Sequence, residues 1–128
     1  MRSANFPKTW SRWSREDLSG EFERLLGGVT DGGTDFAECL ATAGRIDLTN
    51  DESWCRAWAQ IADQTKALAD AALDQGRADI AAINWLRAIN YYQAAAFPLD
   101  SVDERAQGMV ARMQACAGAF LRGRQPQA

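Results

Sequence analysis

The sequence predicts an all-α fold in which about five helices pack as an antiparallel bundle. Apolar residues recur at helical spacing over several stretches, and the breaks between these stretches contain glycine or proline. No segment of useful length alternates between apolar and polar residues, and β-branched residues are sparse. The connections are short, so consecutive helices are expected to lie side by side with opposite directions.

The chain has 128 residues, 47% of them hydrophobic, which suits one globular domain. We expect an N-terminal arm at residues 1–13, a single helical domain at residues 14–122 and a disordered tail at residues 123–128. The arm is polar but carries two tryptophans, which we expect to dock on another surface.

The first helix is expected to have Ser14 as its N-cap, with Asp17 in the position of a capping-box acid. Gly27 and Gly28 end it after about 12 residues. Its apolar positions follow a helical spacing: Leu18, Phe22, Leu25 and Leu26. A turn is expected at residues 31–34.

A short second helix is expected before Gly44, with its apolar face formed by Phe36, Leu40 and Ala43. A loop at residues 45–49 leads to a long third helix, which Asn50 caps and which has acidic residues in its first turn. This helix has a sustained apolar stripe: Trp54, Trp58, Ile61, Thr65, Leu68, Ala72 and Leu73. Gly76 ends the third helix.

The fourth helix, expected at residues 78–97 before Pro98, is apolar on two arcs. One arc consists of Ile80, Ile83, Leu86 and Ile89. The other arc consists of Ala81, Trp85, Ala88 and Tyr92. A helix that is apolar on most sides is buried on all of them or lacks a partner. We therefore expect a homodimer or a complex with another chain.

The fifth helix is expected to begin with a capping box formed by Ser101 and Glu104. Its apolar face consists of Val102, Ala106, Met109, Met113, Cys116 and Phe120.

Composition excludes several classes of chemistry for these residues. The sequence contains no histidine and no G-x-S-x-G motif, so it lacks the base and the elbow of a serine hydrolase triad. Its three cysteines are widely spaced, which supports buried thiols in a reducing environment and neither a zinc site nor a disulfide framework. We expect no metal, no cofactor and no esterase activity.

The formal net charge is −3, and lysine and arginine do not cluster, which argues against nucleic acid as a partner. No apolar run is long enough to span a membrane, and the N-terminus lacks the apolar region of a signal peptide. We therefore expect a cytoplasmic protein without a membrane partner.

The sequence resembles the N-terminal helical cap of one α/β-hydrolase branch, which includes dihydroxypseudooxynicotine hydrolase and the fungal hydrolases that shorten polyketide chains. The resemblance covers about residues 13 to 121, and its most specific element is R-A-x-x-Y-Y. The residues that carry it are Gly33-Thr34-Asp35-Phe36-Ala37-Glu38, Trp54, Trp58, Gly76, Trp85-Leu86-Arg87-Ala88, Tyr91-Tyr92, Ala95 and Phe97.

This resemblance implies a cap that precedes a hydrolase core, with the substrate bound between the two. The core of that branch supplies serine, acid and histidine, and these catalytic residues have no matching positions in this sequence. A helix pair with Ala69, Gly76, Ala78 and Ala88 also resembles one tetratricopeptide unit. Stable arrays of that kind need about three units, and only one is visible.

Aromatic residues that could line an apolar ligand pocket are Trp54, Trp58, Trp85, Tyr91 and Tyr92, although such stripes also form ordinary cores. Because adjacent helical positions cannot both face the same core, we expect one of the two tyrosines to face elsewhere. Asn84 and Asn90 could orient a substrate carbonyl or bond to the backbone. Arg87 could anchor an acidic ligand group or form a salt bridge to Asp63, Asp70 or Glu38.

Three functions follow from these alternatives. The chain could be a cap-like module that shapes an apolar small-molecule pocket, together with a separate α/β-hydrolase core. It could be a stand-alone cyclase or isomerase of a polyketide-like substrate in a biosynthetic pathway. It could also be a peptide-binding scaffold of the tetratricopeptide kind. Whether it is an enzyme by itself stays open.

Overall fold

The computed structural model describes residues 16–47 and 49–123. This part of the chain contains α2 (Glu16–Gly27), α3 (Phe36–Ala43), α4 (Asp51–Asp74), α5 (Ala78–Ala96) and α6 (Glu104–Gly123), and no β-strand. The all-α prediction is confirmed. The expected arm, the cap at Ser14 and residues 124–128 of the expected tail lie outside the described residues.

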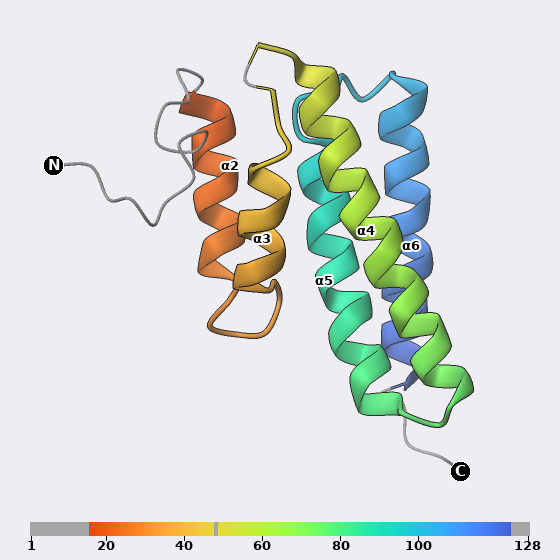
Figure 1. Ribbon diagram of the computed structural model, residues 1–128. Coiled ribbons are helices and arrows are strands. Elements are labelled where there is room, and N and C mark those ends of the chain that lie inside the picture. The colour runs from red at the N-terminus through yellow and green to blue at the C-terminus, as the bar shows by residue number, and fades with distance from the viewer. Residues whose placement is uncertain (1–15, 48, 124–128) are drawn as a thin grey trace, which may run out of the picture.

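Helix α5 runs antiparallel to both α4 and α6 (Figure 1), and it packs against each of them. Helices α2 and α3 form a shorter hairpin beside the half of α5 that includes its C-terminus (Figure 1). The N-terminal half of α5 extends beyond this hairpin, toward the end of the bundle at which α6 finishes. This arrangement leaves one side of α5 covered along only part of its length.

The ends of α3 and α4 agree with two predictions, Asn50 and Gly44. Asn50 accepts a hydrogen bond from the Glu52 N–H at the start of α4, as predicted, and Asp35, for which no cap was predicted, accepts one from the Glu38 N–H at the start of α3. Gly44 is the C-cap residue of α3. The predicted breaks between the first four helices are therefore confirmed.

The capping box expected at Ser101 is wrong. Helix α6 begins at Glu104, and Asp103 accepts a hydrogen bond of 2.8 Å from the Arg105 N–H. Residues 101–103 form a turn after α5, so the aspartate is the first side chain in position to satisfy a free N–H of the new helix. Val102 consequently lies outside the helix and is 77% exposed. Gly123, expected in the tail, is the last residue of α6.

The α4 stripe is confirmed at Trp54, Trp58, Thr65 and Ala72 and is wrong at Leu68 and Leu73. Trp54 and Trp58 are buried, whereas Leu68 and Leu73 are 57% and 49% exposed. Alanines take the buried positions where α4 and α5 pack: Ala62, Ala69, Ala72, Ala81 and Ala88. Small residues allow the two helix backbones to approach closely, so larger side chains turn toward solvent there. For the same kind of reason α3 buries Cys39, Thr42 and Ala43 and leaves Phe36 exposed.

Alanine at Gly76 is expected to lower the free energy of unfolding by about 1–2 kcal/mol, because the φ of Gly76 is +76° and a Cβ is strained in that region. The matched control is Gly20→Ala in exposed α2, where nothing lies within 4 Å of an added Cβ. That change should raise stability by about 0.5–1 kcal/mol. Urea unfolding of both variants measures the difference, and equal effects of the same sign would contradict the assignment.

Candidate functional site

The aromatic residues predicted to line a ligand pocket form the centre of the core. Trp54, Trp58, Tyr91 and Tyr92 have no exposed surface, and Trp85 is 3% exposed. The Trp58 ring lies 5.7 Å from that of Trp54 and 5.8 Å from that of Tyr91, measured between centroids. Phe22 of α2 packs on Trp58 at 6.3 Å. These rings join α2, α4 and α5, and a ligand contact for them stays a prediction.

The buried indoles differ in their hydrogen bonds. Trp54 Nε1 donates to the Ala94 carbonyl at 2.7 Å, and Trp85 Nε1 donates to Asp70 at 3.0 Å. Trp58 Nε1 and Thr42 Oγ1 are buried without a hydrogen-bond partner. Two of the three core tryptophans therefore also fix the distance between α4 and α5 through polar contacts.

The two tyrosines are both buried because they face different neighbours. Tyr91 donates to Glu38 at 2.7 Å and accepts from the Asp35 N–H at 2.9 Å, both at the start of α3. Tyr92 donates to Asp63 of α4, and the Arg112 guanidinium of α6 lies 6.0 Å from the centre of its ring. The two tyrosines do face different neighbours, as expected, but neither lies outside the packed interior. Tyr92 is buried at a second packing interface, against α4 and α6.

Burial, together with hydrogen bonds to the Glu38 and Asp63 carboxylates, raises the pKa of Tyr91 and of Tyr92 well above its ordinary value. The chain has only these two tyrosines. We expect no tyrosinate absorbance from the folded protein near pH 10, where both titrate once the chain is unfolded in guanidinium. Since the raised pKa values disfavour ionisation of the two tyrosines in the folded state, their contribution to stability should be constant below about pH 10 and fall above it. A reversible tyrosinate step near pH 10 with unchanged circular dichroism would contradict this.

Arg87 does not form the expected salt bridge. Its Nε donates to the Gly32 carbonyl at 3.3 Å, and its side chain is half-buried. Glu38 accepts from Tyr91, Asp63 accepts from Tyr92, and Asp70 pairs with Lys66 at 2.9 Å. The salt-bridge alternative is therefore wrong for all three acids.

A polar seam joins α5 to the turn between α2 and α3. We use this name for Arg87, Asn90 and Tyr91, which bond to Gly32, Gly33 and Asp35 respectively. The Asn90 amide donates to the Gly33 carbonyl at 2.8 Å, and a Cβ at Gly33 would lie 3.1 Å from the same nitrogen. A side chain at position 33 would therefore require the Asn90 amide to shift by a few tenths of an ångström. The polar seam thus connects Gly33 and Asp35 with Arg87 and Tyr91, which belong to two separate segments of the sequence resemblance.

Two further polar groups complete this region. Asn90 also accepts from Arg24 at 3.4 Å, and Arg24 binds Glu21 through two nitrogens at 2.9 and 2.7 Å. Glu21 is buried at 5% exposure, so its charge needs this partner. The Asn84 amide donates to Ile80 in its own helix. Backbone bonding is therefore confirmed for both asparagines.

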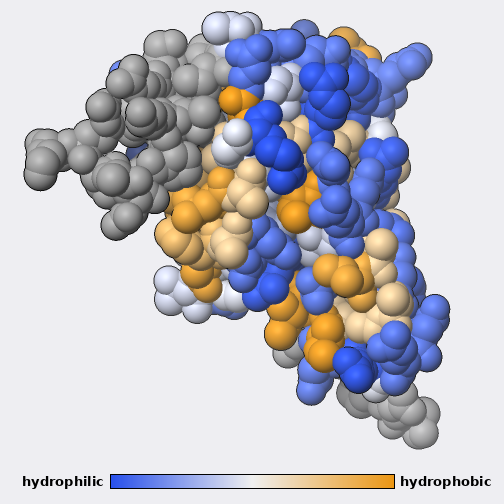
Figure 2. All heavy atoms as spheres, viewed as in Figure 1, coloured by the Kyte–Doolittle hydropathy of each residue, from blue (hydrophilic) through white to orange (hydrophobic). Residues whose placement is uncertain are grey.

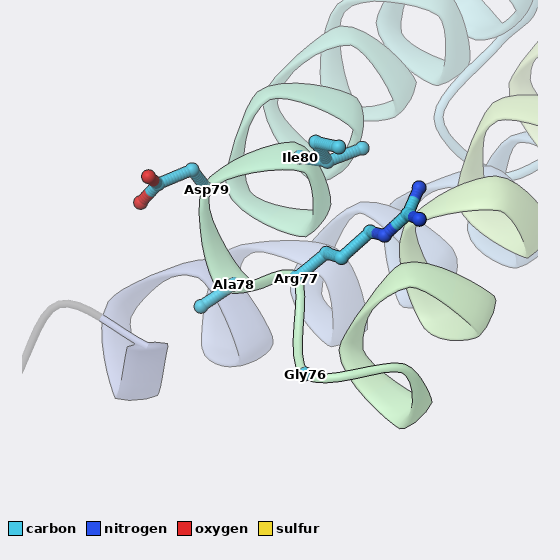
Figure 3. Close-up of a pocket in the computed structure, with 5 residues that line it drawn as sticks. All are labelled: Gly76, Arg77, Ala78, Asp79 and Ile80. Carbon is cyan, nitrogen blue, oxygen red and sulfur yellow. The ribbon is translucent and has the colours of Figure 1, made fainter.

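The described residues form surface depressions away from the aromatic core. One of about 440 Å³ follows the α4–α5 turn along residues 76–80, where Arg77 and Asp79 point away from each other (Figure 3). Another, of about 210 Å³, is lined by the apolar residues Cys55, Ala59, Leu99 and Met109 together with charged ones. A third, of about 300 Å³, lies between α5 and α6 and is lined by Asp79, Ala82, Ile83, Leu86 and Phe120.

This third depression lies on the first apolar arc of α5. Ile80 and Ile83 are 46% and 45% exposed, whereas Trp85 and Ala88 on the opposite arc are buried. Figure 2 shows hydrophobic residues gathered at the lower end of the bundle, beyond the α2–α3 hairpin. We call Ile80, Ile83 and Leu86 of α5 the open apolar arc; Phe120 of α6 lines the same depression and packs partly against the core. The apolar pattern of the arc is visible in the sequence, but nothing in the pattern tells which of the two arcs stays open.

Within residues 16–47 and 49–123, no cluster of cysteine, aspartate and glutamate is suited to hold a metal ion. Cys39, Cys55 and Cys116 are buried and free, as predicted. Burial raises the pKa of the Cys39 thiol to about 11, so it is inert at neutral pH. Among the helices described, none has the length and apolarity to cross a membrane.

Several fungal hydrolases are similar to this chain. The hydrolyase poxO of Penicillium oxalicum is 47% identical over 82 residues, which are 64% of this chain and 20% of that protein. The 20-hydroxy-prefusarin hydrolase of Gibberella moniliformis is 40% identical over 103 residues, or 80% of this chain and 24% of that protein. The alpha/beta hydrolase xenA of Xenoacremonium sinensis is 32% identical over 96 residues, 75% of this chain and 23% of that protein.

The chain thus resembles fungal hydrolases over most of its own length and spans less than a quarter of theirs. No family model matches the sequence. No solved structure matches it either. The all-α chain is therefore similar to one part of these hydrolases, and the larger part of each of them has no counterpart in it.

Proposed function

We propose that this chain acts as a helical cap-like module of an α/β-hydrolase and shapes an apolar small-molecule pocket. The similarity to fungal hydrolases over one part of their length carries the proposal. The chain itself has no histidine, so a hydrolase triad must be completed by residues outside it. In this function the helices bind, orient and exclude water, and a separate core supplies the nucleophile and the base.

The open apolar arc supports the same function. Ligand pockets have mostly apolar walls with a few polar groups, and this arc presents isoleucine and leucine beside a depression of about 300 Å³. The aromatic core behind it keeps the α5 backbone in place, because Trp85 and Tyr92 bond to Asp70 and Asp63 of α4. A rigid helix with one open apolar face suits a pocket wall.

The proposal is tested with a chimera of the Gibberella enzyme. The matched 103 residues of that hydrolase are replaced by those of this chain, and turnover of 20-hydroxy-prefusarin is measured. We expect activity well above that of the same enzyme with the segment deleted. A folded chimera with no more activity than the deletion variant would refute the proposal.

The isolated chain provides a second measurement. We expect no hydrolysis of activated esters, because the sequence offers no base to a serine. Turnover that a serine-directed inhibitor abolishes in a contaminant-free sample would contradict the cap-like function. Isomerisation or cyclisation of a polyketide-like substrate by the isolated chain would favour the stand-alone enzyme instead.

A further inference from the structure

We infer that Arg87 binds the anionic oxygen of an apolar ligand that lies along the open apolar arc of α5. The ligand class is an apolar carboxylic acid or an enol of similar acidity. The inference rests on the proposed function, since it names the kind of molecule that the pocket wall takes.

The charge of Arg87 has no partner of opposite sign in the described part of the chain. The three acids named from the sequence as its candidate partners are engaged elsewhere: Glu38 with Tyr91, Asp63 with Tyr92, and Asp70 with Lys66 and Trp85. Two other arginines of the structure do pair, Arg24 with Glu21 and Arg105 with Asp103. Among the described residues, the half-buried guanidinium of Arg87 thus has the Gly32 carbonyl as a hydrogen-bond partner and no anion.

The guanidinium is oriented by one hydrogen bond only. Nε donates to the Gly32 carbonyl, and neither Nη atom has a hydrogen-bond partner within the described residues. Because the backbone turn holds Nε, the two terminal nitrogens remain as a fixed pair of donors. Such a pair matches the two oxygens of a carboxylate and gives a charge-assisted hydrogen bond.

Arg87 borders the open apolar arc. It follows Ile83 by four positions on α5, and residues four apart on a helix lie on the same face, about 5–6 Å between Cβ atoms. Ile83, Leu86 and Asp79 line the depression, and Arg87 lies one turn beyond Ile83 on the same face of α5. Arg87 and Asp79 are about 12 Å apart along the helix axis. We therefore place the anionic end of the ligand at Arg87, away from Asp79, and its apolar body on Ile83 and Leu86.

The test measures binding of two probes to the full chain by isothermal titration calorimetry. One probe is 1-naphthoate, and the other is the uncharged 1-naphthamide of nearly the same shape. We expect naphthoate to bind about tenfold more tightly than the amide. In Arg87→Met, which keeps the apolar stem, this preference should vanish while the affinity for the amide stays unchanged. Ile83→Asp should weaken binding of both probes.

Two controls match these variants. Arg77→Met removes an exposed arginine of the same helix region, and Val110→Asp changes an apolar residue that is 45% exposed, as Ile83 is. Val110 lies on α6 about 15 Å from Phe120 along the helix axis. Both controls should bind the probes as the unchanged chain does. If Arg87→Met does not fold, Arg87→Lys replaces it and should lose part of the preference, because one point charge replaces the fork.

Equal affinity of the two probes, no binding of either, or an unchanged preference in Arg87→Met would overturn the inference. A loss of preference in Arg77→Met of the same size would also overturn it. These outcomes are independent of the hydrolase chimera, which tests the proposed function without the probes. An active chimera whose inserted chain shows no preference for naphthoate would leave the cap-like function standing and remove Arg87 as its anchor.

Discussion

Replacing Trp58 by alanine is expected to lower the free energy of unfolding by about 3–5 kcal/mol. Trp58 has no exposed surface and packs on Trp54, Tyr91 and Phe22, so its loss leaves a cavity between three helices. Most single domains are stable by about 5–15 kcal/mol, so this one change removes a large part of the total. Urea unfolding followed by circular dichroism measures it.

The control is Leu68→Ala in the same helix. Leu68 is 57% exposed, and its replacement should change stability by no more than about 0.5 kcal/mol. A different result for Trp58→Ala would revise the site: a small loss of stability, combined with lost binding of an apolar ligand, would show that the residue faces a ligand cavity and not the core.

Replacing Tyr91 by phenylalanine is expected to lower the free energy of unfolding by about 1.5–3 kcal/mol. The hydroxyl bonds both to the Glu38 carboxylate and to the Asp35 N–H, and phenylalanine leaves both groups near the core without a partner. Hydrogen exchange at the start of α3 should become faster. The backbone amides in the middle of α4 and α5 should keep their relative order of protection.

Tyr92→Phe is the matched comparison, because Tyr92 is equally buried but its partner Asp63 is exposed and can bind water instead. We expect a loss of about 0.5–1.5 kcal/mol and no faster exchange in α3. If both variants accelerate exchange in α3 equally, Tyr91 does not hold the α2–α3 hairpin through its hydroxyl.

Sequence patterns predicted the helices well where a local signal exists. Asn50 occupies a cap position that depends on nearby backbone groups alone, and Gly76 breaks the chain through its own φ. The start of α6 was predicted incorrectly because Ser101 and Asp103 are both good caps, and the path of the chain after α5 decides between them. A local sequence signal determines where a helix begins only if a single residue in that region can serve as its cap.

Burial and the candidate site were less predictable. The sequence shows that α5 is apolar on two arcs, but it does not show that the α2–α3 hairpin stops short of Ile80 and Ile83. It identifies Arg87 as a charge in an apolar helix, but not that Glu38, Asp63 and Asp70 are each engaged by another group. Both facts depend on which distant residues meet, and periodicity carries no information about that.

The sequence by itself determined the all-α class, the order of the helices, the buried thiols and the resemblance to a hydrolase cap, because these follow from composition, spacing and residue identity. Only the tertiary structure decided that Trp58 and Tyr91 form the core, that Arg87 and Asn90 hold the turn at Gly32 and Gly33, and that Ile83 stays open. The physical reason is close packing: alanines bring α4 and α5 together, and this approach determines which large side chains are enclosed and which remain at the surface.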